Sequence, residues 1–225
     1  MAAKTPSSAA VSEPTLPFGL AEALMIADWK RRVTVTYGNV RSAHGERAAW
    51  DEWRRARDWL MGSHPRTPLP PDRRSDFTGL LYFDYDQEAR VLGTVREVAP
   101  STVSFEMSKG DVQPMTRLAE VTFELYGSSH SLDLFWMESW RGGLFLPFRD
   151  NTTRQTTYGG GRYLVDSMKG EDLGVEGDQL VLDFNYAFQP PCAYNPNFSC
   201  PLPGPGSRID ADVKAGERLS FERTG

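Results

Sequence analysis

From Thr78 onwards, short runs of β-branched and aromatic residues alternate with turn residues, and this pattern constrains the fold more than any other. Two runs show the period of two that is typical of strands with one buried face: Val121/Phe123/Leu125 and Leu132/Leu134/Trp136. The pattern predicts strands over residues 78–85, 90–98, 102–107, 117–126, 131–137, 144–148, 161–165, 179–184 and 218–221. So many strands with short links predict a mainly β (α+β) protein, built on an antiparallel β-barrel or sandwich-like barrel.

The segment before these strands predicts a helical hairpin. Residues 32–37 alternate like a strand, but apolar residues also recur at the helical steps of three and four: Ile26, Trp29, Val33, Tyr37 and Val40. The longer pattern favours a helix over residues 20–39, and a second stripe predicts a helix over residues 46–61. Because glycine is favoured just past a helix end, the second helix should stop at Gly62.

The stripe of the second helix carries one charged residue, Arg57, among its apolar side chains. We expect Trp50, Trp53 and Trp59 to pack between the helices and the barrel. The next segment, residues 63–76, is too rich in proline to continue the helix and must be an extended connector. The hairpin then covers one end of the barrel or lies along its side.

Composition limits the class of protein. The chain has 225 residues, of which 40% are hydrophobic and 12% aromatic, enough to build a core. A net charge of −5 argues against nucleic acid or an anionic membrane as partner. Residues 1–17 lack the apolar run of a secretory signal. We expect a cytoplasmic protein with a flexible tail (1–17) and a single domain (18–225): the hairpin (18–62), the connector (63–76) and the barrel (77–225), which includes a Pro/Cys-rich loop (189–208).

Several sequence blocks occur in a fixed order: HPRTPL (64–69), FTGLLYF (77–83), LPFRD (146–150), YGGGRYL (158–164), LDFN (182–185), CAYNP (192–196), CPLP (200–203) and AGE (215–217). Together they resemble the bacterial and archaeal family catalogued as domain of unknown function 1684. The resemblance covers about residues 20 to 220 and implies a single domain without an assigned role. The loop at residues 204–208 departs from it, because the resemblance leads one to expect proline, glutamate and asparagine there.

Five polar residues lie in, or directly after, three of the predicted strands: Arg149, Asp150, Arg162, Asp183 and Asn185. As a site at the barrel mouth, Arg149 and Arg162 would hold a carboxylate, phosphate or carbonyl group, with Asn185 as a further contact and Asp183 as the base. As a structural network, the same arginine–aspartate pairs and the asparagine would bond the long proline-rich loop. Both interpretations remain open, and we expect Asp150 to be structural.

Aromatic residues and one histidine accompany these charges. Tyr158 would donate to a developing oxyanion, and Tyr194 would stack on a ligand, but packing at the rim with a satisfied hydroxyl is favoured for any single tyrosine. Trp136 would line an apolar cavity that holds one acid, Glu138, whose pKa burial would raise. Glu217 is a further carboxylate. His64 is either the general base of a cleft between helices and barrel or a donor to a loop carbonyl.

The glycine run before Arg162 and the two cysteines have structural interpretations. The run lacks the Gly-Lys-Ser/Thr ending and the following helix of a phosphate loop, so Gly161 should make a tight entry into a strand. Cys192 and Cys200 are eight residues apart in one stiff loop. Buried reduced thiols, a disulfide, and a metal or nucleophilic role all remain open.

These residues lead to a functional hypothesis. The protein is expected to be an enzyme of the hydrolase, isomerase or cyclase type, which uses acid/base and electrostatic catalysis on a small anionic or carbonyl-containing molecule without a cofactor or metal. Asp183, Tyr158 and His64 would act in catalysis. Substrate would be bound by Arg149, Arg162, Asn185, Tyr194 and Trp136. The alternative is a non-catalytic module that binds a metabolite or a protein and uses the arginine–aspartate network structurally.

Overall fold

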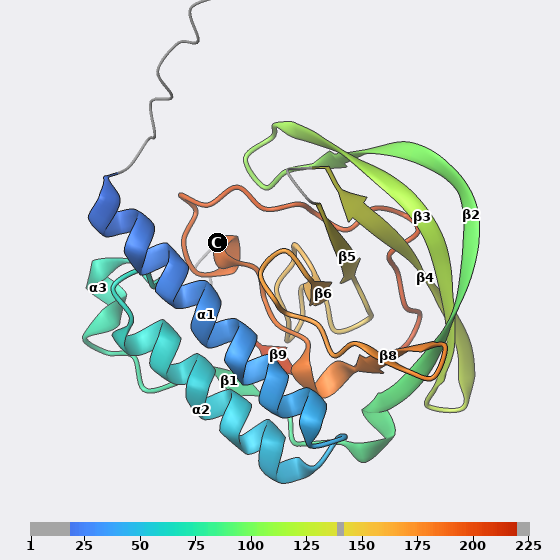
Figure 1. Cartoon of the computed structure of the whole chain (residues 1–225), viewed down its shortest axis with the longest axis horizontal. Coiled ribbons are helices and arrows are strands. Elements are labelled where there is room, and N and C mark those ends of the chain that lie inside the picture. Colours follow the sequence, from blue (N-terminus) through green and yellow to red (C-terminus); the bar gives the residue numbers. More distant parts are fainter. Residues whose placement is uncertain (1–18, 139–141, 220–225) are drawn as a thin grey trace, which may run out of the picture.

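A helical hairpin packs beside a curved antiparallel sheet in the computed structural model, which describes residues 19–138 and 142–219 (Figure 1). The hairpin consists of α1 (Leu20–Ser42) and α2 (Arg47–Ser63), followed by the short helix α3 (Pro71–Arg74). The helix predicted over residues 32–37 is confirmed. The predicted tail at residues 1–17 lies outside the described residues.

The main sheet has seven strands in the order β6-β5-β4-β3-β2-β8-β7, and every neighbouring pair is antiparallel. The strands are β2 (Arg90–Glu106), β3 (Val112–Leu125), β4 (Ser128–Met137), β5 (Gly143–Phe148), β6 (Arg162–Asp166), β7 (Val175–Glu176) and β8 (Gln179–Asp183). The mainly β fold is therefore confirmed in its coarse form.

The sheet does not close, so the predicted barrel is not found. Its edge strands β6 and β7 do not pair with each other. The outer side of β6 is occupied by local chain instead, because Tyr163 bridges Phe188 and Asp166 bridges Glu171. β7 is only two residues long, and it cannot offer the ladder that closure requires.

Two predicted strands are one continuous element. Residues 90–98 and 102–107 both lie in β2, which is irregular between Glu97 and Ser101. A bulge of this kind bends a strand, and Figure 1 shows β2, β3 and β4 curving together around the molecule. Only two residues of the predicted strand at 78–85 form a strand, β1 (Leu81–Tyr82), which pairs with β9 (Glu217–Arg218). β9 therefore begins one residue before the predicted strand over 218–221, and residues 220–221 lie outside the described residues.

The hairpin packs on the sheet through a cluster of aromatic residues. Trp50 and Trp53 are fully buried, and the Trp53 ring meets that of Tyr186 edge-on at 5.1 Å. Trp50 Nε1 also donates to the backbone carbonyl of Asn185 at 3.0 Å. Trp59 is 43% exposed, so its predicted place in the core is wrong. Its ring lies on the outer side of the hairpin, where it contacts His64 and the guanidinium of Arg32.

Candidate functional site

Arg162 and Asp150 form a buried clasp on the C-terminal segment. Arg162 is 1% exposed, and its Nη2 donates to Asp150 Oδ2 at 3.0 Å. The same guanidinium donates to the carbonyls of Val213, Ala215 and Glu217. Asp150 also accepts from the Val213 amide at 3.0 Å. These bonds occupy the guanidinium, and the geometry matches the structural interpretation of this pair.

Asp183 and Asn185 organise the turn after β8. Asp183 Oδ1 accepts from the amide and the side chain of Asn185, while Asn185 bonds the backbone of Asp86 in both directions. Burial raises the pKa of Asp183 to about 6, and its Oδ2 has no hydrogen-bond partner within the described protein. Asp183 lines a small cavity of about 110 Å³ beside Tyr186. Among the predicted site residues, this cavity contains Asp183 alone.

Tyr158 packs on the two cysteines beneath the proline-rich loop. Both cysteines are buried and free, and the Cys192 amide donates to Cys200 Sγ at 3.3 Å. The hydrogen bond from Cys200, with those from Tyr158 and Ser108, lowers the pKa of Cys192 to about 6. Gly161 adopts φ +86°, as expected for a tight entry into β6.

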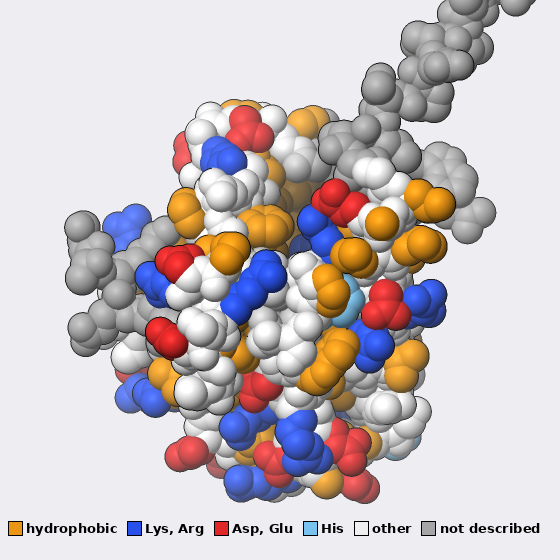
Figure 2. Space-filling model, turned by 90° about the vertical axis from the view of Figure 1, so that its left-hand side faces the viewer, with side chains coloured by type: hydrophobic (Ala, Val, Ile, Leu, Met, Phe, Trp, Pro, Cys, Tyr) orange, Lys and Arg blue, Asp and Glu red, His pale blue; other side chains and the backbone are white. Residues whose placement is uncertain are grey.

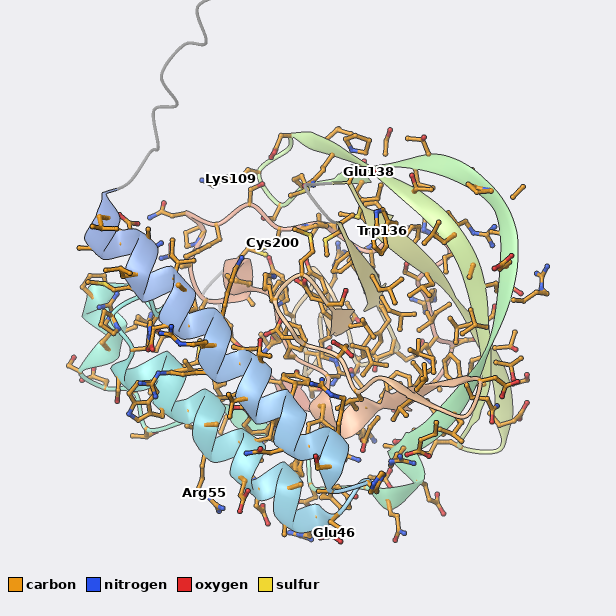
Figure 3. All side chains as sticks on the ribbon, viewed as in Figure 1. Glu46, Arg55, Lys109, Trp136, Glu138 and Cys200 are labelled. Carbon is orange, nitrogen blue, oxygen red and sulfur yellow. The ribbon has the colours of Figure 1, made fainter. Side chains whose placement is uncertain are left out.

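His64 and Trp136 lie in two other regions. His64 Nδ1 accepts from the Arg66 amide at 3.0 Å, so its Nε2 donates to Asp28 Oδ2 at 3.3 Å and fastens the connector to α1. Trp136 is half-buried on β4, and Figure 3 places it near Glu138 at the end of that strand, far from the helices. The sequence-predicted residues are therefore not brought to one pocket.

A cavity between the hairpin and the sheet brings a different set of polar groups together. We call it the helix–sheet cavity, and its volume is about 60 Å³, room for about four waters. Its apolar wall includes Trp53, Leu60 and Phe188. Its polar wall contains Tyr37, Arg57, Lys169, Glu171, Gln189 and Tyr194. Figure 2 looks onto the side that carries the helices and shows hydrophobic side chains gathered around a hollow.

Arg57 is held at this cavity by Glu217. Its Nη2 lies 2.9 Å from Glu217 Oε2, and both side chains are nearly inaccessible. Glu217 Oε2 also accepts from the Gln189 amide at 3.1 Å. Burial lowers the pKa of Arg57, but the carboxylate of Glu217 and further negative neighbours outweigh it, so the net pKa is raised. Arg57 is therefore a fixed positive charge on the cavity wall.

Glu171 is the buried acid of the cavity with an unused oxygen. It is 6% exposed, its Oε1 lies 3.8 Å from Arg57 Nη1, and its Oε2 has no hydrogen-bond partner within the described protein. Burial raises the pKa of Glu171 to about 7. Lys169 and Arg57 oppose that shift, whereas Asp166 and Glu217 reinforce it. This carboxyl group can therefore give or take a proton near neutral pH.

Other polar atoms around the cavity also lack partners within the described protein. They are the hydroxyl groups of Tyr37 and Tyr194, Trp53 Nε1, Arg57 Nε and Gln189 Oε1. Buried polar atoms are nearly always hydrogen-bonded, so a group of orphans on one cavity indicates that water or a ligand completes their bonding. Lys169, which bonds Asp166 at 2.5 Å, stands at the open side with its side chain 40% exposed.

Sequence reasoning missed most of this cavity. Tyr194 is the predicted site residue that it contains. Arg57 had a sequence signal, since a charge on the apolar stripe of a helix requires a buried partner. Glu171 had none, because it lies in a short polar loop, and only the bridge between Asp166 and Glu171 buries it against β6.

Within the ranges 19–138 and 142–219, no group of three His, Cys, Asp or Glu side chains is arranged to hold a metal ion. In the same part of the chain, the helices are all too short or too polar to span a bilayer.

Comparisons with known proteins identify relatives that have no assigned role. The model of the family described as "Protein of unknown function (DUF1684)" matches residues 75–218. The chain is also similar to an uncharacterized protein of Haloarcula marismortui whose solution NMR structure has been determined. The two are 39% identical over 76% of this chain and 93% of that chain, with a TM-score of 0.56. No curated protein matches.

Proposed function

We propose that this chain, which belongs to the DUF1684 family of proteins of unknown function, is an enzyme that transfers protons to or from a small organic molecule. The reacting group of the substrate enters the helix–sheet cavity, and no organic cofactor takes part. A cytoplasmic location and a substrate with an anionic or carbonyl group belong to the same proposal.

The observation that carries the proposal is the state of Glu171. Its buried carboxyl group has one oxygen without a hydrogen-bond partner within the described protein and a pKa near 7. Catalytic acids and bases work best when their pKa lies near the working pH, and burial of a carboxyl group in a cleft is a common way to achieve this. A purely structural carboxylate is better served by the arrangement of Glu217, which is ion-paired and accepts a hydrogen bond from the Gln189 backbone amide.

The surrounding groups supply the other parts of such a reaction. Arg57 stands 3.8 Å from Glu171 and provides positive charge for an oxyanion that develops when a proton leaves carbon or oxygen. The unpartnered hydroxyl groups of Tyr37 and Tyr194 can donate to the same oxygen. The cavity volume of about 60 Å³ suits a compact polar group of the substrate rather than its whole body.

Screening and turnover measurements together test this proposal. Metabolite mixtures are first screened for compounds that raise the melting temperature of the protein, and each hit is then incubated with it and followed by mass spectrometry and proton NMR. Because proton transfer can leave the mass unchanged, exchange of substrate hydrogens in D₂O is part of the measurement. We expect one hit to be converted or to exchange hydrogen with wild type.

The variants Glu171→Gln and Glu124→Gln make the test specific. Both lose one carboxylate, but Glu124 is exposed on β3. We expect Glu171→Gln to bind the hit and lose about 100-fold or more of the rate, and Glu124→Gln to retain it. Binding without conversion or exchange by wild type would instead establish a non-catalytic binding module.

A further inference from the structure

A second pocket lies between β2, β4 and the proline-rich loop, and it shares no lining residue with the helix–sheet cavity. Its volume is about 530 Å³, within the range of roughly 300–1,000 Å³ for small-molecule sites. We call it the Arg149 pocket. Its lining includes Phe105 on β2, Phe135 on β4, Arg149 after β5, and Pro203 and Arg208 in the loop.

The Arg149 pocket has a firm apolar wall. Phe105 and Phe135 are buried, and their rings meet edge-on at 4.7 Å. Pro203 is buried in the facing loop, which backbone hydrogen bonds hold to the sheet: Leu202 N to Glu106 O at 2.8 Å and Asp133 N to Gly206 O at 2.8 Å. A wall fixed in this way suits the flat or aliphatic body of a small ligand.

Arg149 places a cation on the wall of this pocket. Its side chain forms no ion pair or hydrogen bond within the described ranges, and its Nε is buried without a partner. Burial lowers the pKa of Arg149, repulsion by Arg154 adds to this effect, and the more weakly acting charge of Glu106 opposes it. A partly desolvated guanidinium without a partner is costly to keep, and a bound anion would remove that cost.

The other charges of the pocket leave room for one negative group. Arg208 stands beside Arg149 through a parallel backbone bridge, and its Nη2 donates to Asn151 at 2.9 Å. The Asp133 carboxylate is neutralised by Arg117, whose Nε lies 2.6 Å away. Glu106 remains, but it is exposed and forms no ion pair with Arg149. A monoanion therefore fits better than a group with two negative charges.

We propose that the Arg149 pocket is a second binding site, which takes a small organic monocarboxylate with an apolar body. The carboxylate receives the forked donors of Arg149, and the apolar body lies against Phe105 and Phe135. Arginine matches a carboxylate because its planar guanidinium can donate two parallel hydrogen bonds. The site is independent of the proposed chemistry at Glu171.

Protein-observed NMR with phenylacetate as the probe tests this site. The full chain is labelled with ¹⁵N and titrated with phenylacetate, and separately with the neutral analogue phenylacetamide. We expect saturable amide shifts at β2, at β4 and at the loop of residues 202–208. Phenylacetate should bind about 10- to 100-fold more tightly than phenylacetamide, because a hydrogen bond to a charged group is lost in the amide.

Three variants assign the effect to Arg149. Arg149→Gln should weaken phenylacetate binding by the same factor, and Arg149→Lys, which keeps the charge but not the fork, should weaken it less. Arg154→Gln removes a nearby exposed charge outside the pocket and should change the affinity by less than about threefold.

Several outcomes would overturn the proposal. Shifts that do not saturate or that cluster elsewhere show that the pocket is not a site for a monocarboxylate. Equal affinities for phenylacetate and phenylacetamide in wild type would do the same without any variant, should Arg149→Gln fail to fold. If Arg154→Gln weakened phenylacetate binding as much as Arg149→Gln, the affinity would come from the overall positive charge of the region and not from a site at Arg149.

Discussion

At the scale of single residues, the protein keeps charge in places where water is excluded. Arg57 and Glu217 are paired at 2.9 Å, and each has further partners or charges to offset its burial. Glu171 is different, because its closest guanidinium contact is 3.8 Å and one oxygen stays unbonded within the described protein. Protonation is the cheapest way to bury such a group, which is the physical reason for its raised pKa.

The raised pKa of Glu171 predicts how stability changes with pH. The pKa of Glu171 is about 7 in the folded protein, and its ordinary value is 4.5. Between these two pH values the folded state keeps a proton that the unfolded state has released. This contribution to the free energy of unfolding is present below about pH 4.5 and is lost as the pH rises through about 7. Between about pH 5 and 8, the free energy of unfolding should fall more for wild type than for Glu171→Gln, by on the order of 1–3 kcal/mol.

Urea unfolding at several pH values measures this difference. Asp183, whose pKa is also raised by burial, contributes alike to wild type and variant, and it cancels in the comparison. Glu124→Gln is the control and should follow the wild-type curve, since Glu124 is exposed. Parallel curves for Glu171→Gln and wild type would show that Glu171 titrates normally.

At the scale of elements, the turn before β6 decides where that strand begins. Gly161 N donates to the Tyr158 carbonyl at 2.9 Å, and the backbone then enters β6 beside β5. A Cβ at Gly161 would lie 2.7 Å from the carbonyl oxygen of Phe148. Glycine is therefore required at residue 161 for two reasons: the positive φ and the close approach of β5.

Gly161→Ala should consequently be more damaging than an ordinary substitution in a turn. The left-handed conformation alone costs about 1–2 kcal/mol for a residue with a Cβ, and the contact with the Phe148 carbonyl adds to it. Gly177→Ala is the matched control, because Gly177 has φ +62° but open space around its Cβ. Denaturant unfolding should show the larger loss for Gly161→Ala, and equal losses would mean that the contact relaxes without cost.

At the scale of the whole molecule, Arg162 joins segments that are distant in the sequence. Its guanidinium bonds Asp150 and three carbonyls between residues 213 and 217, the segment that leads into β9. β9 pairs with β1, which follows the helices and the connector. The buried side chain of Arg162 thus connects the main sheet to the segment of residues 213–217, which leads into β9.

Arg162→Met should therefore destabilise the entire fold. The substitution leaves the buried Asp150 carboxylate without its cation, and breaking a buried pair costs about 3–5 kcal/mol. Arg96→Met is the control, since Arg96 pairs with Glu120 at 3.0 Å with its side chain 65% exposed, and exposed pairs contribute about 0–1 kcal/mol. Thermal and urea unfolding measure both, and a loss below about 1 kcal/mol for Arg162→Met would contradict the clasp.

The strand pattern predicted most of the sheet, because alternation reports burial on one face. The runs around Val121 and Leu132 became β3 and β4, paired at those residues. Closure failed as a prediction because it depends on what the edges of the sheet meet, and here Phe188 and Glu171 occupy the edge of β6. Trp59 failed because a helical stripe gives the direction of a side chain but not the width of the covered face.

By itself, the sequence determined the two helices, the positions of most strands along the chain, the glycine turn at residue 161 and membership of the family. Each of these depends on local pattern or on residues in order along the chain. Only the tertiary structure decided which polar residues share a cavity, since Arg57, Glu171 and Tyr194 come from three distant segments. Burial and the charge of neighbours set the pKa of a side chain, and both exist only once the chain is folded.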